Sequence, residues 1–412
     1  MYDIPERLVF LVPRVPVSDE EQRVSLVAKV VPEWGWALAG GWQVEFWGLR
    51  PWRRPPSPGD RLTVRGPRCP RLGQPLFSLA VNTAHLVLVL RRRRPGILLG
   101  AGGWGISGAA AALRLTGHRA PLIVKVNVHS EGDGMARRGH RVAPRIVLGV
   151  ERFVLRTADL VTTVGASTSR FATDAGVARE QILQRSAAVS GGLFAPPPEA
   201  RRDPMLVACV ARLEPRKAID VLLRAVAEVR TAHSGVKVEI AGQGGLRDNL
   251  EALAADLGIA DCVTFRGWVP RPDIPAFLAR AAVFVLPSRA DEGLPKVVVE
   301  AGLAGCAVVG TDVRGTNELV ASGVTGELVP PDDPPALAAV LTRLLADPDE
   351  VTRLAQAARD VAVAHQLRHL QRRDELRQRT LALLSDRQGS PPAGSVGGDG
   401  RVRPGRTTPP GA

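Results

Sequence analysis

The sequence is poor in cysteine and in aromatic side chains, and each shortage excludes a class of protein. Its four cysteines among 412 residues form no C-x-x-C pair, which argues against a disulfide framework or a zinc site and favours buried free thiols in a reducing compartment. Aromatic residues make up only 4% of the chain, and no nucleic-acid-binding motif accompanies them. We therefore expect no specific nucleic-acid partner.

Extended apolar segments are also scarce. The start, MYDIPERLVFLV, lacks the basic residues that open a signal peptide, so its short apolar run predicts a first strand. A charge-free run over residues 95–113 is nearly long enough to cross a bilayer. It contains six glycines, so we predict a strand, a loop and a helix there. A cytoplasmic protein is expected.

Positive charge is concentrated in the first half of the chain. Residues 1–190 contain 27 Lys and Arg against 14 Asp and Glu, whereas residues 191–412 contain 27 of each, so the whole net charge of +13 comes from the first half. That half includes the run Arg91–Arg94. Such charge suggests an anionic membrane surface, here the inner face, or an acidic substrate as partner. A solvated, arginine-rich surface without a specific partner is the alternative.

The second half alternates short apolar runs with helical patterns. We predict strands at 205–211, 236–242, 262–267, 283–287 and 306–310, and helices at Ile219–Arg230, Leu246–Leu257, Ile274–Ala281, Pro295–Ala304 and Ala336–Ala346. This alternation predicts a parallel sheet with right-handed crossovers. Residues 205–346 should therefore form one doubly wound α/β domain.

The first half shows a weaker version of the same pattern. Residues 1–190 are predicted to form a second doubly wound domain, with strands at Leu8–Val12, Gln43–Trp47, Ile97–Leu99, Leu122–Val126 and Leu160–Val164. Residues 51–73 are rich in Pro and Arg and predict an irregular loop. A proline-rich linker over 191–204 separates the halves. One or two polar helices over 347–386 and a disordered Gly/Pro/Ser-rich tail over 387–412 complete the chain.

Two glutamates mark the segment EGLPKVVVEAG. Glu292 should lie just before a helix and Glu300 within it, about 12 Å apart along the axis at about 1.5 Å per residue. That separation is wide for the carboxylate pair of a glycosidase, but it suits two contacts on one long ligand. The amides at the start of a helix can also bind phosphate or sugar oxygens.

Two cations and a glycine-rich turn are predicted to lie near these glutamates. Arg212 follows a strand, Lys217 begins the next helical segment, and Gly242 opens the turn in AGQGGL. Open α/β sheets bind ligands at the carboxyl ends of their strands. The cations could neutralise a diphosphate there, and glycine allows the backbone to approach a ligand closely.

The motifs R-L-x-P-x-K, A-G-x-G-x-L, F-x-G-x-V, E-G-L-P-x7-E and G-T-D-x-x-G-x-x-E-L-V occur in this order over residues 205–346. In order and spacing they resemble the retaining glycosyltransferases of the family 4 type, which have the GT-B fold. The resemblance implies two Rossmann-like domains facing a central cleft, with a nucleotide-diphosphate sugar as co-substrate and no other cofactor.

The resemblance also implies roles for individual residues. Arg212 and Lys217 would bind the diphosphate, Glu300 the ribose hydroxyls, and Glu292 the transferred sugar. The amides of Gly293 and Leu294 would assist Glu292. The backbone around Gly267 and Val269 would face the base, and the segment LIVKVNVHSEG would place His129 near the reacting sugar.

Two departures from the family pattern leave the acceptor open. VPRVPVSDEEQRV stands where the family often has a Gly-Gly loop, and VSGG replaces the usual Pro-Asn-Gly turn before the linker. We expect a glycan, a lipid-linked or a secondary-metabolite acceptor. The expected reaction is hexosyl transfer with retention and without a metal, because the D-x-D match at Asp347 lies where helix punctuation is expected.

Two other functions stay open at this point. One is a non-hydrolysing nucleotide-sugar 2-epimerase, which shares the two-domain plan but would need more acid and base groups at the sugar than the sequence offers. The other is a non-enzymatic basic protein that binds membranes or nucleic acid, which the charge of the first half suggests.

Overall fold

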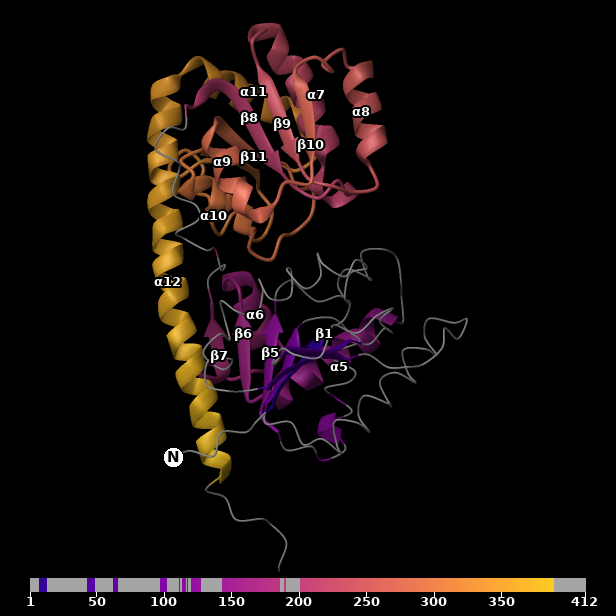
Figure 1. Ribbon diagram of the computed structural model, residues 1–412, viewed down its shortest axis with the longest axis vertical. Helices are drawn as coiled ribbons and strands as arrows, with labels where there is room; N and C mark the ends of the chain where they lie inside the picture. Colours follow the sequence, from indigo (N-terminus) through magenta and orange to yellow (C-terminus); the bar gives the residue numbers. More distant parts are fainter. Residues whose placement is uncertain are drawn as a thin grey trace, which may run out of the picture.

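The computed structural model describes residues 7–12, 43–48, 62–65, 97–101, 111, 113–115, 117, 120–126, 143–185, 189 and 201–388. Within these residues the chain forms two parallel α/β units that lie one above the other, with a long helix, α12, along one side of both (Figure 1). The predicted architecture is therefore confirmed.

The first unit is built on a seven-stranded parallel sheet in the order β3-β2-β1-β4-β5-β6-β7. Its strands are β1 (Arg7–Val12), β2 (Gln43–Gly48), β3 (Leu62–Arg65), β4 (Ile97–Ala101), β5 (Leu122–Val126), β6 (Leu160–Thr163) and β7 (Ile182–Gln184). Helices α5 (Ala143–Thr157) and α6 (Ala166–Asp174) flank β6 along the chain. The five predicted strands are all present.

One prediction for this unit is wrong. Residues 51–73 are not wholly irregular, because β3 pairs in parallel with β2 along Val44↔Leu62 to Trp47↔Arg65. The strand is four residues long and ends the sheet. So short an edge strand among prolines gives no clear periodic signal. Strand β7, at the opposite edge, is three residues long and was not predicted either.

The second unit is a six-stranded parallel sheet in the order β10-β9-β8-β11-β12-β13. Its strands are β8 (Asp203–Val210), β9 (Lys237–Ala241), β10 (Val263–Gly267), β11 (Ala281–Leu286), β12 (Ala307–Thr311) and β13 (Glu327–Val329). Its helices are α7 (Ile219–Ala232), α8 (Arg247–Asp256), α9 (Ile274–Ala279), α10 (Lys296–Leu303), α11 (Pro334–Ala346) and α12 (Pro348–Gln388). This strand order is that of a doubly wound nucleotide-binding fold.

The core of the second unit lies on both faces of its sheet. Strand β11 is buried along its whole length. Because successive side chains of a strand point to opposite faces, Val283 and Val285 pack in the layer under α7 and α11. Phe284 and Leu286 pack in the layer under α9 and α10. Two thiols, Cys209 and Cys306, are free and buried in these layers, as predicted. Cys262 is free but only half-buried, and Cys69 lies outside the described residues.

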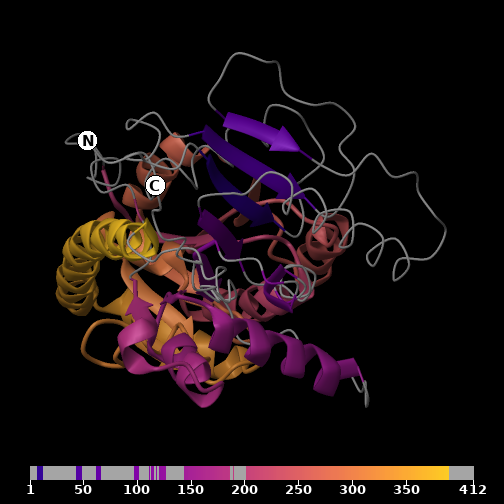
Figure 2. The ribbon, with the colours of Figure 1, turned by 90° about the horizontal axis from the view of Figure 1, so that it is seen from below.

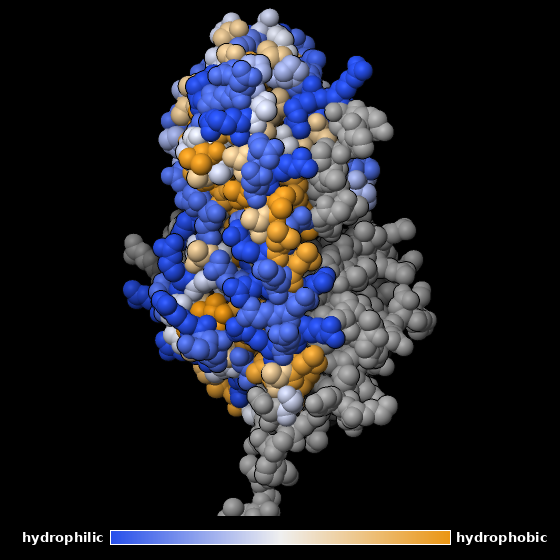
Figure 3. All heavy atoms as spheres, turned by 90° about the vertical axis from the view of Figure 1, so that its left-hand side faces the viewer, coloured by the Kyte–Doolittle hydropathy of each residue, from blue (hydrophilic) through white to orange (hydrophobic). Residues whose placement is uncertain are grey.

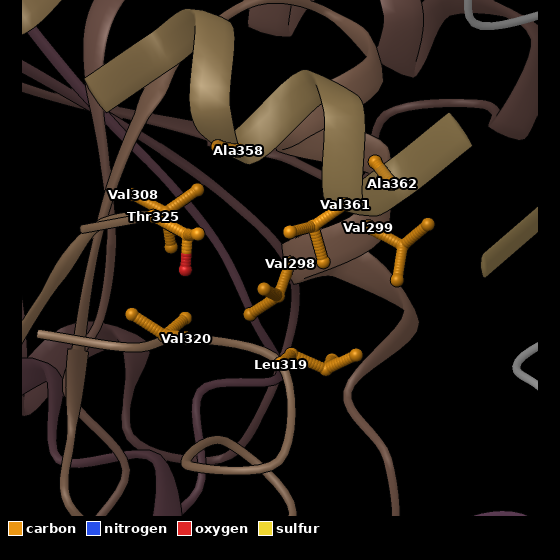
Figure 4. Close-up of a pocket in the computed structure, with 9 residues that line it drawn as sticks. All are labelled: Val298, Val299, Val308, Leu319, Val320, Thr325, Ala358, Val361 and Ala362. Carbon is orange, nitrogen blue, oxygen red and sulfur yellow. The ribbon is translucent and has the colours of Figure 1, made fainter. Parts of the chain in front are cut away.

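Helix α12 is a single helix, although one or two were predicted, and it ends two residues later than expected. It lies so close to α10 that a Cβ on Gly302 would come within 2.7 Å of the Ala358 carbonyl oxygen. Beside this contact is a small apolar hollow (Figure 4), lined by Val298, Val299, Val308, Leu319, Val320, Thr325, Ala358, Val361 and Ala362. The remainder of the predicted tail lies outside the described residues.

Helix α12 continues from the second unit alongside the first. Seen from below, it lies at the side of both units (Figure 2). Gln366 donates to the Val189 carbonyl at 3.2 Å, and Arg379 donates to the Glu180 carbonyl at 2.7 Å. The face on this side of the molecule mixes hydrophilic and apolar side chains (Figure 3). Leu367 is one of the exposed apolar residues of α12. Of the described helices, α12 included, none combines the length and apolarity needed to cross a bilayer.

The units also contact each other through their carboxyl edges. Glu318 lies in the segment between β12 and β13, and α6 begins after β6. The Glu318 carboxylate accepts the backbone N–H of Ala166 at 2.5 Å and of Ser167 at 2.9 Å. A carboxylate at the N-terminus of a helix is favoured by the free amides and by the helix dipole. This contact joins the two sheets on the side where their strands end.

Candidate active site

Two loops of the second unit meet where its strand order reverses. Strands β8 and β11 are parallel neighbours, and their next strands along the chain lie on opposite sides. The loop after β8 contains a 3₁₀ turn, Pro215–Lys217, and the loop after β11 leads to α10 through Glu292. Open α/β sheets bind ligands at such a switch point.

Glu292 is the centre of this meeting point. Its carboxylate accepts hydrogen bonds from Lys217 Nζ at 2.6 Å, Arg216 Nη2 at 2.9 Å and Ser288 Oγ at 2.6 Å. The side chain of Glu292 is 7% exposed and that of Lys217 12%. Two cations share one carboxylate, so the cluster keeps a positive charge at the edge of the sheet. The sequence predicted this proximity of Lys217 and Glu292.

Glu300 lies in α10 and faces a different partner. Its carboxylate, 8% exposed, accepts from Arg271 Nη2 at 2.9 Å. Arg271 stands in the turn that follows β10. Burial raises the pKa of the Glu300 carboxyl, and the positive charges of Arg271 and Lys296 oppose that rise. The two glutamates therefore occupy separate environments, as their spacing predicts.

The segment before α10 is tightly packed. Gly293 is buried and Leu294 is half-buried. The helix begins at Lys296, with Pro295 as its N-cap, so the predicted helix start is one residue early. Gly315 lies against the carbonyls of Glu292 and Gly293 so closely that a Cβ there would overlap them. This contact fixes the path of the backbone beside the Glu292 carboxylate.

The glycines predicted to face the nucleotide lie together at the ends of β9 and β10. The N–H of Gly242 donates to the Gly267 carbonyl at 2.7 Å. Both have positive φ, 152° and 68°, and a Cβ on Gly242 would overlap the Ala211 carbonyl. Glycine is required there because of that overlap. Val269 is half-buried, and Trp268 beside it is 56% exposed.

Arg212 does not join the Glu292 cluster in this structure. Its guanidinium pairs with Glu214 and is 64% exposed, whereas Lys217 contacts Glu292 directly. To reach a shared ligand, Arg212 has to leave a solvent-exposed ion pair, which costs about 0–1 kcal/mol. His129, the residue expected near the reacting sugar, lies outside the described residues, so its role stays a prediction.

Three residues of the site were missed by sequence reasoning. Arg216 is the neighbour of Lys217, Ser288 follows β11, and Arg271 follows the base-facing segment. Each contacts a predicted glutamate through its side chain. Their adjacency to motif residues was the only signal in the sequence, because the direction of a loop side chain leaves no periodic pattern.

The D-x-D match has a structural role. Asp347 Oδ1 accepts the backbone N–H groups of Asp349 at 3.1 Å and Glu350 at 3.0 Å, so it caps the start of α12, as predicted. In the part of the chain that the structure describes, no group of three His, Cys, Asp or Glu side chains is arranged to hold a metal ion.

Two family models match the chain, one on each unit. The model described as "Glycosyl transferases group 1" matches residues 194–361. The model described as "Glycosyl transferase 4-like domain" matches residues 29–186. The first match contains the whole cluster around Glu292.

Named relatives resemble the chain over much of its length. It is 35% identical over 276 residues to the GDP-mannose-dependent alpha-(1-6)-phosphatidylinositol monomannoside mannosyltransferase of Mycolicibacterium smegmatis, covering 62% of this chain and 70% of that protein. It is 34% identical over 234 residues to the D-inositol 3-phosphate glycosyltransferase of Thermomonospora curvata, covering 52% and 53%.

Solved structures support the fold. The sucrose-phosphate synthase of Thermosynechococcus elongatus superposes with a TM-score of 0.75 at 21% identity, over 92% of this chain and all of that one. Anabaena HepE, in complex with UDP and glucose, superposes with a TM-score of 0.69 at 19% identity, over 92% and 99%. At this level of identity the likeness concerns the fold alone.

Proposed function

Because this chain belongs to the group 1 glycosyltransferases, of the family 4 type, we propose that it transfers a mannosyl group from GDP-mannose to an acceptor that carries a phosphorylated inositol. The broader activity is established by the family. The protein transfers a hexose from a nucleotide-diphosphate sugar with retention of configuration. The relatives are transferases and support neither a 2-epimerase nor a non-enzymatic binding protein.

The names of the relatives carry the finer proposal. The mannosyltransferase that covers most of the chain uses GDP-mannose, and its acceptor is a phosphatidylinositol monomannoside. The relative from Thermomonospora curvata acts on D-inositol 3-phosphate. An inositol with a phosphate is common to both names, so it is the acceptor chemistry that we carry over to this protein.

The geometry of the Glu292 cluster supports a role in donor binding. A nucleotide diphosphate is an anion, and Lys217 and Arg216 offer two cations that one carboxylate only partly neutralises. In the proposed arrangement Arg212 turns away from Glu214 to join them. Glu300 lies within α10, which begins at Lys296, whereas Glu292 precedes that helix. Their carboxylates have different partners, Arg271 for Glu300 and Lys217 for Glu292. Such separate positions suit a ribose at Glu300 while the sugar is at Glu292.

The proposed mechanism relies on electrostatics at the leaving group. As the bond between the sugar and the phosphate breaks, charge develops on the diphosphate, and cations that are already in place stabilise it. The acceptor hydroxyl attacks from the face that the diphosphate leaves, which retains the configuration, and the departing phosphate takes the proton. His129 would lie at the reacting sugar, and closure of the two units would exclude water.

We also propose that the protein works at the cytoplasmic face of an anionic membrane. The excess positive charge of residues 1–190 and the lipid acceptor in the mannosyltransferase's name support this. The buried free thiols agree with a reducing compartment. Co-sedimentation with vesicles should increase with anionic lipid and decrease with salt. Equal recovery with neutral vesicles at low salt would refute membrane attraction.

A two-step experiment tests the substrates. Melting temperatures are first measured with GDP-mannose, GDP-glucose, UDP-glucose and UDP-N-acetylglucosamine, because a ligand of the folded state raises the melting temperature. We expect GDP-mannose to give the largest increase. Labelled mannose transfer is then measured to phosphatidylinositol, its monomannoside and free inositol phosphate, with glycerol phosphate as the control. A UDP-sugar as the best stabiliser, or equal transfer to glycerol phosphate, would overturn the donor or the acceptor respectively.

A further inference from the structure

Arg289 forms hydrogen bonds with several segments of the second unit. It lies in the loop after β11, and its side chain is 29% exposed. Its guanidinium donates to the Pro215 carbonyl at 2.5 Å, to the Asp220 carboxylate at 2.9 and 3.1 Å, and to Asp332 at 2.7 Å. Its backbone N–H donates to the Arg216 carbonyl at 3.0 Å. One residue thus joins the loops after β8 and β11 to the start of α7.

The backbone bordering Arg289 is strained. Ala218 and Asp332 have φ of 49° and 57°, and they are the non-glycine residues with positive φ among those described. Ala218 ends the 3₁₀ turn whose carbonyls Arg289 holds, and Asp332 accepts from its guanidinium. A non-glycine residue in this conformation costs about 1–3 kcal/mol and persists only where its surroundings impose it. Aspartate adopts this conformation more readily than alanine does, so the strain is greater at Ala218, beside the turn that Arg289 holds.

The strained turn is also the one that presents the site cations. Arg216 and Lys217 occupy its last two positions, and no side chain caps it. Arg289 holds the turn by the carbonyls of Pro215 and Arg216, whereas the two cations of the turn reach the Glu292 carboxylate with their side chains. Its own charge is matched by Asp220 and Asp332, so it is committed to these contacts and not to a ligand.

We propose that Arg289 is a positioning residue that fixes the turn Pro215–Lys217 for binding of the donor diphosphate. The inference rests on the proposed donor site at Lys217 and Glu292. The side chain of Arg289 bonds to Pro215, Asp220 and Asp332, and the proposed role is exerted through the turn. It acts by holding the turn that carries the two cations, Arg216 and Lys217.

The test measures what the second phosphate adds to nucleotide affinity. Dissociation constants for GDP and GMP, with UDP and UMP in parallel, are measured by calorimetry on the full chain. A general structural defect weakens both nucleotides alike, whereas misplaced cations weaken the diphosphate selectively. We expect Arg289→Ala to reduce the advantage of GDP over GMP at least fivefold. Arg343→Ala is the matched control, because Arg343 also bridges two carboxylates, Glu327 and Glu350, in the same unit.

Further variants separate the possible failures. Arg289→Lys keeps the charge but cannot reach all the partners, so it should lose the same advantage while keeping the melting temperature. If Arg289→Ala does not fold, the GDP to GMP ratio of Arg289→Lys tests the proposal instead. An unchanged GDP to GMP ratio in a folded Arg289 variant, with a reduced ratio in Lys217→Ala, would overturn the proposal. An unchanged ratio in Lys217→Ala would instead refute the donor site.

Discussion

Glu318→Gln should loosen the contact between the two units. The Glu318 carboxylate accepts two backbone N–H groups from the start of α6, one on each oxygen. Glutamine keeps one acceptor oxygen and loses both the second acceptor and the charge. A charge-assisted hydrogen bond contributes about 1.5–3 kcal/mol when buried, and a charge at a helix terminus about 0.3–1 kcal/mol. Because Ala166 is exposed, we take a total loss of about 1–2 kcal/mol.

That loss corresponds to a shift of roughly 5- to 30-fold in the ratio of closed to open arrangements. Single-molecule energy transfer between a dye on α5 and a dye on α8 would report the distance between the units. We expect a larger open population and a lower kcat/KM, since closure brings the donor and acceptor sides together. Glu251→Gln is the control, because Glu251 pairs with Arg247 on its own helix.

One result would show that Glu318 does not hold the two units together. If Glu318→Gln and Glu251→Gln give the same distance distribution and kcat/KM values within twofold of each other, the contact does not hold the units together. A lower melting temperature alone would not rescue it, because the prediction concerns the arrangement of two folded units.

The other predictions concern the glutamates, the metal and the packing of α12. Glu300→Gln should mainly weaken GDP binding and Glu292→Gln should mainly lower kcat; equal losses of GDP affinity would contradict separate roles. Burial raises the pKa of Glu300 above its usual 4.5, so its carboxylate, the proposed ribose ligand, should become protonated as the pH falls, beginning above that value. GDP affinity should decrease over that range, and the profile of Glu300→Gln should lack this step. Transfer should survive exhaustive chelation; loss on chelation with rescue by magnesium, together with inactivity of Asp347→Ala, would show a metal site. Gly302→Ala should lower the free energy of unfolding by about 1–3 kcal/mol in a denaturant titration, because its Cβ would come within 2.7 Å of a carbonyl oxygen of α12. Gly149→Ala is the control and should be neutral or stabilising, because a Cβ there has nothing within 4 Å. Equal effects of the two substitutions would refute the packing argument.

The fold of the second unit could be predicted because local patterns of apolar and polar residues mark its strands and helices. Each of the five predicted strands is a short apolar run bounded by helical segments, and β11 is buried on both faces. The helix limits agree within about two residues. The edge strands β3, β7 and β13 were not predicted, because three or four residues give too short a pattern to distinguish a strand from a loop.

Part of the site could also be predicted, because the sheet topology determines which loops lie together. The switch point brings the loops after β8 and β11 together, so the contact between Lys217 and Glu292 follows from the topology. Which arginine takes the second oxygen of Glu292 does not follow. Arg212 pairs with Glu214 while Arg216 reaches Glu292, a choice that depends on side-chain rotamers within a strained turn. The contact of Arg271 with Glu300 likewise depends on the path of one loop.

The course of α12 has a consequence for biosynthesis. This helix is the last described element of the chain, yet it lies beside β7 and bonds to Glu180 in the first unit. During synthesis the first unit emerges from the ribosome early. Helix α12, which lies beside β7 of that unit, is synthesised only after the whole second unit. Leu376 and Thr380, fully buried in the finished protein, can reach their places only after the second unit has been synthesised. Domains generally fold as they are synthesised, N-terminal first. Here the unit that emerges first is the last to be completed, because the helix that joins the two sheets is synthesised after both of them.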